Sequence, residues 1–304
     1  MRYLERNSNV KIGCLCAIAC ETLFGFSYMF TKNATGQASE IALLGWRFFI
    51  AVLVMGICAA TGIIKIKIKG KSLRPLLLVA LFSPVIYFIG ETFGISNTTA
   101  SESGAFLACI PVVSLIASSL ILNKKPSKMQ VAGILTTLAG VLVTVFAVGA
   151  NTSLSIGGYA ALLIAVIAYA LYSVFVEKAE NYTGEEVTFA MLLSGAVVFI
   201  IMALLQGILN GNVVELIGLP FTNRGFLIAC LYQGIGCSVL AFFLSNVAIA
   251  KIGVNRTSSF IGIATVVSIF AGVLILKEPF TPFQVIGVVL IIAGVYIANS
   301  RMKE

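Results

Sequence analysis

Three ionisable side chains stand inside long apolar stretches of this sequence. Glu21 lies near the middle of the first stretch, Arg47 about eight residues into the second, and Glu91 in the later half of the third. Within a membrane, such a group costs roughly 2.5–3.5 kcal/mol on translocon scales and usually faces a cavity or a partner. A buried carboxylate attracts cations, and because burial disfavours its charged form it can also exchange a proton.

Two arrangements of these charges are compatible with the sequence. In the one we favour, Arg47 neutralises one glutamate as a structural pair, and the other acid remains for a substrate or a proton. In the other, all three form one structural cluster. Glu21 lies at a similar depth to Arg47, and Glu91 is the alternative partner; the sequence does not choose between them. Glu102, at the start of the fourth stretch and near its outer end, is expected at the interface.

Aromatic side chains share helix faces with these acids. Tyr87 precedes Glu91 by four residues and Tyr28 follows Glu21 by seven, spacings that place each pair on one face. Rings around a carboxylate suit an organic ammonium, through charge and cation–π attraction. The expected substrate-binding residues are Glu21, Tyr28, Trp46, Tyr87, Glu91, Tyr169, Tyr172 and Tyr232.

Some of these residues also have a simpler interpretation. Trp46, the single tryptophan, and some of the tyrosines are equally compatible with anchors at the membrane interface. For Tyr87 the cavity is favoured. Gln233 and Asn246 are weaker candidates for the same site.

The composition places these residues in a membrane protein. Of 304 residues, 59% are hydrophobic and 11% charged, and the mean hydropathy is +1.05; soluble domains carry roughly 25% charged residues. The net charge of +8 does not indicate nucleic acid, because the basic residues fall in short connections. The seven cysteines lie in apolar stretches without CxxC spacing or any histidine, so we expect packing roles and neither metal nor cofactor.

The apolar stretches predict an all-α membrane protein with ten transmembrane helices. Each is long enough for the ~20 residues that a span requires. With the N-terminus in the cytoplasm, sixteen Lys and Arg residues fall on the inner side and three on the outer side. This bias predicts cytoplasmic N- and C-termini and a multi-pass protein of a cell membrane, that of a bacterium. The expected spans are 11–32, 39–64, 75–96, 101–122, 127–149, 155–178, 186–209, 223–246, 254–276 and 281–300.

The connection after the second span carries the basic run "KIKIKGK" at 65–71. One interpretation is a contact with anionic lipids or a regulator. The simpler one, which we favour at this point, is an ordinary signal of cytoplasmic topology.

The chain contains an internal repeat. "LILNKKPSKMQVAGILTTLAGV" at 120–141 returns as "LILKEPFTPFQVIGVVLIIAGV" at 274–295, which predicts repeats over 1–150 and 151–304. Five helices per repeat is an odd number, so the second repeat enters the membrane from the opposite side. Such inverted repeats underlie alternating access in many secondary transporters.

The repeat also assigns roles to residues outside the expected site. Gly133 and Gly140 recur in register as Gly287 and Gly294, seven residues apart on one face, so the fifth and tenth helices are expected to pack closely together. Glu278 replaces Lys124 in the second copy. Because the two junctions face opposite sides, topology explains this reversal, and Glu278 is not expected in the substrate site.

These segments resemble the ten-helix EamA-type branch of the drug/metabolite transporter superfamily. The resemblance covers nearly the whole chain, through "ETLFGFSYMFTK", "WRFF", "SNTTASESGAFLACIPVVSLIASSLIL" and "LILKEPFTPFQVIGVVLIIAGV". It implies a basket of helices one to four and six to nine around a cavity, with five and ten outside, and transport of small organic metabolites, commonly polar or cationic. The chain departs from the family at "LNKKPS", where a glutamate is usual.

Other function classes fit the sequence less well. An enzyme is not expected, because there is no histidine, no close acid pair and no nucleophile motif, and an ATP-driven pump lacks its GxxxxGK[ST] loop. We expect a secondary transporter of an organic cation or amine, because the intramembrane acids outnumber the base. Its transport could also be coupled to protons. Amino acids and neutral metabolites are the alternatives. The protein is expected to lie in the lipid bilayer. A monomeric state is compatible with the sequence.

Overall fold

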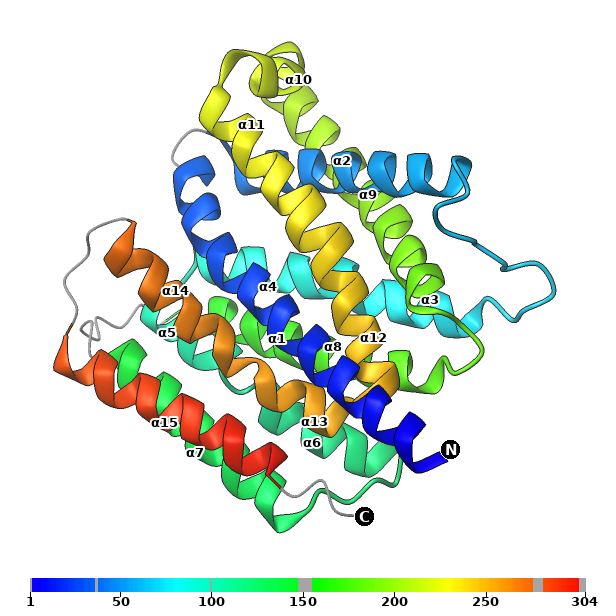
Figure 1. Ribbon diagram of the computed structural model, residues 1–304. Helices are drawn as coiled ribbons and strands as arrows, with labels where there is room; N and C mark the ends of the chain where they lie inside the picture. The colour runs from blue at the N-terminus through cyan, green and yellow to red at the C-terminus, as the bar shows by residue number, and fades with distance from the viewer. Residues whose placement is uncertain (1, 36–37, 99, 147–154, 276–280, 301–304) are drawn as a thin grey trace.

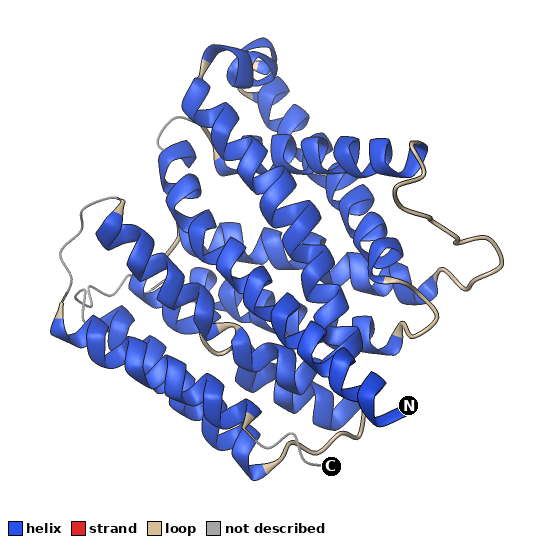
Figure 2. Cartoon of the chain, in the orientation of Figure 1, coloured by secondary structure: helices blue, strands red, loops and turns tan. Residues whose placement is uncertain are grey.

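A computed structural model of the chain describes residues 2–35, 38–98, 100–146, 155–275 and 281–300. All regular secondary structure in these residues is helical, and loops connect the helices (Figure 2). The first half contains α1 (Arg2–Thr35), α2 (Glu40–Ala60), α3 (Arg74–Ala80), η1 (Leu81–Ile86), α4 (Tyr87–Ser96), α5 (Ala100–Leu107), α6 (Ile110–Ile121) and α7 (Lys128–Phe146).

The second half repeats this order with one additional helix. It contains α8 (Ile156–Lys178), α9 (Gly184–Leu209), α10 (Val213–Thr222), α11 (Arg224–Leu231), η2 (Tyr232–Ala241), α12 (Phe242–Ile252), α13 (Val254–Thr257), η3 (Ser258–Phe260), α14 (Gly262–Leu274) and α15 (Pro282–Asn299). Nine helical segments of the described chain are long and apolar enough to cross a membrane. The fourth expected span is present as the shorter pair α5 and α6. This confirms the predicted fold class.

Several predicted boundaries differ from the structure. The span expected at 101–122 is interrupted between Leu107 and Ile110, and Pro111 lies in the first turn of the helix that follows. Proline suits the first turn of a helix because it lacks the N–H that a helix interior needs. The span expected at 223–246 continues to Ile252, and the second span ends at Ala60. Helix α10 lies between two expected spans, in a segment that we expected to be a connection.

The third span bends where it approaches the expected site. Ser83 has an extended backbone, with φ −142° and ψ 124°, and Pro84 follows it. A residue before proline is disfavoured in the α region, and proline removes a helix hydrogen bond. The bend separates the direction of α4 from that of α3, and α4 carries Tyr87, Phe88 and Glu91 along α8.

Helices α7 and α15 form a pair at one edge of the bundle (Figure 1). At Gly133 an added Cβ would lie 2.4 Å from the Ala298 nitrogen, and at Gly140 it would lie 2.7 Å from the Gly287 oxygen. Only glycine allows backbones to approach this closely. The predicted packing role of the fifth and tenth helices is confirmed.

The start of α1 and the end of α15 lie at the same end of the bundle, as an even number of spans requires (Figure 1). We call it the basic end, because the connection between α2 and α3 with its lysines lies there too. Its assignment to the cytoplasm stays a prediction from the Lys and Arg bias. The main core lies between α2, α9 and α12, around Phe48, Met191, Leu192 and Phe199.

Candidate functional site

The acid on α1 is buried without a partner. Glu21 is 5% exposed, and within the described residues its carboxylate has neither a hydrogen bond nor an ion pair. Tyr169 and Tyr172 of α8 lie close enough to interact with its charge. An isolated carboxylate in an apolar interior is strongly unfavourable unless it is neutralised or paired. Glu21 is therefore a candidate for binding a cation.

A buried polar network lies beside this acid and extends from α8 toward α12 and α9. The Tyr172 hydroxyl donates to Asn246 Oδ1 at 2.8 Å, and Asn246 Nδ2 donates to Thr188 Oγ1 at 2.9 Å. The rings of Tyr169 and Tyr172 meet edge to face at 5.4 Å. Because these groups are buried and bonded, they hold the rings beside Glu21 in one arrangement.

The arginine on α2 is anchored away from both acids. Its Nε–H donates to Ser238 Oγ at 2.7 Å, and its guanidinium lies over the Phe88 ring, 4.7 Å from the centroid. No carboxylate of the described chain lies within 4.0 Å of Arg47. Of the two acids, Glu91 is the one that interacts with Arg47 electrostatically. The direct structural ion pair that we favoured from the sequence is thus not formed in this structure.

The second acid is held by the tyrosine one turn before it. The Tyr87 hydroxyl donates to Glu91 Oε1 at 2.6 Å, which places the two side chains on one face of α4 as their spacing predicts. The Tyr87 ring also meets the Tyr169 ring at 5.5 Å. A line of three tyrosine rings therefore connects the surroundings of Glu91 with those of Glu21.

A pocket opens beside Arg47 and Glu91, at the end of the bundle where α2 begins and α4 ends. Two acids and one base face it, since Glu40 at the first turn of α2 joins Glu91 and Arg47. This end is opposite the basic end. The pocket is lined by Glu40, Leu43, Leu44, Arg47, Phe88, Glu91, Thr92, Ile95 and Gln233.

Two expected site residues lie outside this cluster. Trp46 donates its Nε1–H to the Leu216 oxygen of α10 at 3.0 Å. Tyr232 stacks on Phe30 at 4.2 Å and donates to the Leu23 oxygen at 2.9 Å. Both contribute to helix packing. The side chains of Tyr28 and Glu102, and all of Glu278, fall outside the described part of the chain.

Some residues of the site were missed in the sequence. Ser238 is fully buried, and only its bond to Arg47 identifies it. Phe88 was hidden among many apolar residues, although it is the neighbour of Tyr87. In the sequence, Glu40 is an ordinary acid in the first turn of a helix, after the Ser39 N-cap. Only the fold shows that it lines the pocket. Among the described residues, no group of three potential ligands could hold a metal ion.

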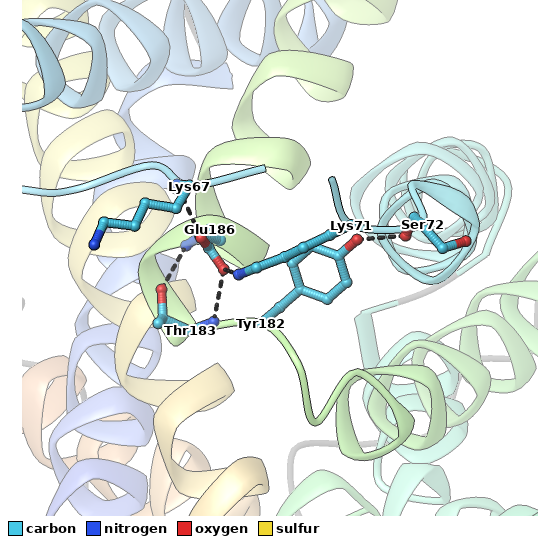
Figure 3. A network of polar contacts seen from close by, with 6 residues as sticks. All are labelled: Lys67, Lys71, Ser72, Tyr182, Thr183 and Glu186. Atoms are coloured by element: carbon cyan, nitrogen blue, oxygen red, sulfur yellow. Dashed lines mark hydrogen bonds and ion pairs between the residues drawn. The ribbon is translucent and has the colours of Figure 1, made fainter. Parts of the chain in front are cut away.

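Two carboxylates at the basic end join the halves of the chain. Glu186, at the start of α9, accepts from the Lys67 backbone N–H at 2.9 Å and from Lys71 Nζ at 2.6 Å (Figure 3). It also completes a capping box with Thr183. The Tyr182 hydroxyl donates to the Ser72 oxygen. We call this set of contacts the Glu186 clamp.

The second closure centres on Glu177, at the end of α8. Its carboxylate pairs with Lys124 and accepts the Val254 backbone N–H at 2.6 Å. Gly253, with φ +77°, reverses the chain between α12 and α13 so that this N–H points at the acid. We call these contacts the Glu177 clamp. Lys124 is the position at which the second copy of the internal repeat carries Glu278.

Comparison with known proteins agrees with this architecture. A model of the EamA-like transporter family matches residues 11–146 and again residues 156–300. The uncharacterized transporter YcxC of Bacillus subtilis is 29% identical over 292 residues, covering 95% of this chain and 93% of that protein. A "Probable amino-acid metabolite efflux pump" of Salmonella typhimurium is 23% identical over 282 residues, covering 82% of this chain and 93% of that protein.

A solved crystal structure shares the fold, with a TM-score of 0.79 and 19% identity over 94% of this chain and 97% of that one. Together with the helical segments and the family match along both halves, this identifies a multi-pass membrane transporter. The chain belongs to the EamA-like transporter family, within the drug/metabolite transporter superfamily.

Proposed function

We propose that the protein transports a small organic solute that carries a protonated amine, and that Glu21 receives the ammonium group. One observation carries this proposal: Glu21 is buried and has no partner in the described chain, beside Tyr169 and Tyr172. An ammonium would compensate the carboxylate, and the rings would contact its apolar part.

The solute would reach Glu21 from the pocket at Glu40, Arg47 and Glu91. Two acids at its entrance attract cations, and Arg47 limits how many positive charges it accepts. The contacting tyrosine rings between Glu91 and Glu21 would have to move apart and line its path. While the solute enters, the Glu186 and Glu177 clamps would keep the basic end closed. Both clamps would open when the two halves rock and the site becomes accessible from the basic end.

Proton exchange follows from the same site. In the empty transporter Glu21 would be neutralised by a proton, since no protein cation is within ion-pair distance in the described chain. An arriving ammonium would displace this proton. One cation would then cross in each direction, so a pH gradient would drive accumulation of the amine.

A thermal-shift screen of the purified transporter tests the substrate class. Primary and quaternary amines, amino acids, nucleosides and organic anions are compared for the unfolding temperature that each produces. We expect amines to stabilise the wild type, since a ligand of the native state raises stability in proportion to log concentration above its Kd, and to stabilise Glu21→Gln much less. Stabilisation by neutral or anionic compounds alone would contradict the proposal.

Amino acids are the second candidate, favoured by a specific observation. Arg47 and Glu91 face one pocket without a direct ion pair, so an ammonium and a carboxylate of one solute can be matched there. The relative from Salmonella typhimurium carries a related name. The same screen separates the two: an amino acid should bind more tightly than its decarboxylated amine, and Arg47→Gln should abolish that preference.

A further inference from the structure

The connection between α2 and α3, residues 61–73, forms a basic arm at the basic end of the bundle (Figure 1). Burial alternates along it: Ile64, Ile66 and Ile68 are half-buried, whereas the intervening lysines are exposed. Alternation with a period of two is the pattern of an extended segment. Ile64 and Ile68 pack against the main core, so one side of the arm is fixed to the protein.

The Glu186 clamp fixes the same arm by polar contacts. Both carboxylate oxygens of Glu186 are occupied, by the Lys67 backbone, the Lys71 ammonium and the Thr183 backbone. The Lys71 ammonium lies 4.9 Å from the centre of the Tyr182 ring. Figure 3 shows that the Lys67 ammonium points away from the acid although its backbone is bound to it. The clamp therefore holds the arm without neutralising its outward lysines.

Three lysines remain on the outer side of the arm. Lys65, Lys67 and Lys69 are exposed, and in the described chain none has an ion-pair partner. Two apolar side chains flank them: Ile63 is 74% exposed and Leu73 is 52% exposed. Lysines flanked by exposed apolar side chains, at the junction of two membrane spans, match the boundary between headgroups and acyl chains.

We propose that the basic arm binds the headgroups of anionic phospholipids. Lys65, Lys67 and Lys69 contact the phosphates, and Ile63 and Leu73 insert at the acyl boundary. A lipid is favoured over a soluble anion because the arm begins and ends at membrane spans, and because Ile63 and Leu73 beside the lysines are exposed in the described chain. Since the arm is preformed, little ordering is needed on binding.

Native mass spectrometry of the full-length transporter tests this surface, with dioleoyl phosphatidylglycerol and dioleoyl phosphatidylcholine titrated into detergent. We expect preferential binding of phosphatidylglycerol. The triple variant Lys65→Gln, Lys67→Gln, Lys69→Gln should weaken that binding roughly tenfold or more, given the contribution of each juxtamembrane lysine. The Arg triple at the same positions should retain it. The matched control is Lys125→Gln, Lys128→Gln, Lys178→Gln, which removes the same charge from other exposed positions at that end.

Three results would overturn the proposal: equal loss in both Gln triples, no preference for phosphatidylglycerol in the wild type, or full competition by free glycerol phosphate at equal concentration. If the arm variant does not fold, salt replaces it. Raising NaCl from about 50 to 500 mM should release phosphatidylglycerol from the wild type, because exposed charges are screened. Lipid retention that is unchanged by salt would also contradict the proposal that the arm binds anionic headgroups.

Discussion

Arg47 donates its Nε–H to Ser238 Oγ at 2.7 Å, and this bond holds the guanidinium against Phe88 instead of against a carboxylate. The serine comes from η2 in the second half of the chain and the arginine from α2 in the first. The bond therefore joins the two halves within the membrane. It also leaves Glu21 and Glu91 free of a direct ion pair with the nearest intramembrane base.

Ser238→Ala should destabilise the transporter, because it leaves a buried charged donor without its acceptor. We expect a loss of about 1.5–3 kcal/mol in the free energy of unfolding. Ser114→Ala is the matched control, since Ser114 is equally buried and its hydroxyl has no hydrogen-bond partner among the described residues. Thermal unfolding in detergent compares the two. A similar decrease for both variants would show that the Arg47 bond contributes nothing specific.

Tyr87→Phe should weaken amine binding while the fold is retained. The variant removes the 2.6 Å bond that holds Glu91 toward the pocket, and a bond to a charged group corresponds to roughly tenfold or more in affinity. Tyr296→Phe, at a 74% exposed position on α15, is the control. Ligand-induced thermal shifts give both affinities. Unchanged affinity in Tyr87→Phe would show that Glu91, at the entrance of the pocket, does not contribute to amine binding.

The seam between α7 and α15 should not tolerate a single methyl group. In Gly133→Ala the new Cβ would meet the Ala298 backbone at 2.4 Å, so one helix must move, at a cost of about 1–3 kcal/mol. Gly56→Ala on α2 meets nothing within 4 Å and should be neutral or stabilising by about 0.5–1 kcal/mol. Unfolding temperatures that fall equally for both variants would refute a close-packed seam.

Much of this fold could be predicted from the sequence, for physical reasons that apply to particular residues. Length and hydropathy place the spans, and the register of Gly133 with Gly287 predicts the α7–α15 pair. The bend at Ser83–Pro84 was missed, although the Ser-Pro pair interrupts an apolar run, because hydropathy does not report a change of helix direction. Helix α10 was missed because it continues an apolar stretch.

The site was harder to predict than the fold. Helical spacing links Tyr87 to Glu91 because both lie on one helix, and the structure bears this out. Spacing cannot tell which side chain of a distant helix meets Arg47, so Ser238 was not found. For the same reason Trp46 and Tyr232 were grouped with the site, whereas their hydrogen bonds go to α10 and α1. Which side chains of two helices meet depends on how the helices pack, and a single sequence does not reveal this packing.

The Glu177 clamp should control opening of the basic end. Glu177→Gln removes the charge that attracts Lys124 and weakens the bond to the Val254 N–H. We expect faster hydrogen–deuterium exchange at the start of α13 and a larger open fraction. Glu180→Gln, at an exposed position three residues further along the chain and just beyond α8, is the control. Equal exchange in wild type and Glu177→Gln would mean that the clamp does not limit opening.

The most direct test of the central claim is amine transport by purified protein in liposomes with an imposed pH gradient. Glu21→Gln cannot release a proton or pair with an ammonium, and it nearly preserves the size of the side chain. The account predicts that the wild type accumulates an amine against its gradient when the pH gradient favours exchange. Glu21→Gln should lose this response, and Glu180→Gln should keep it. Undiminished pH-driven accumulation by Glu21→Gln would contradict the account.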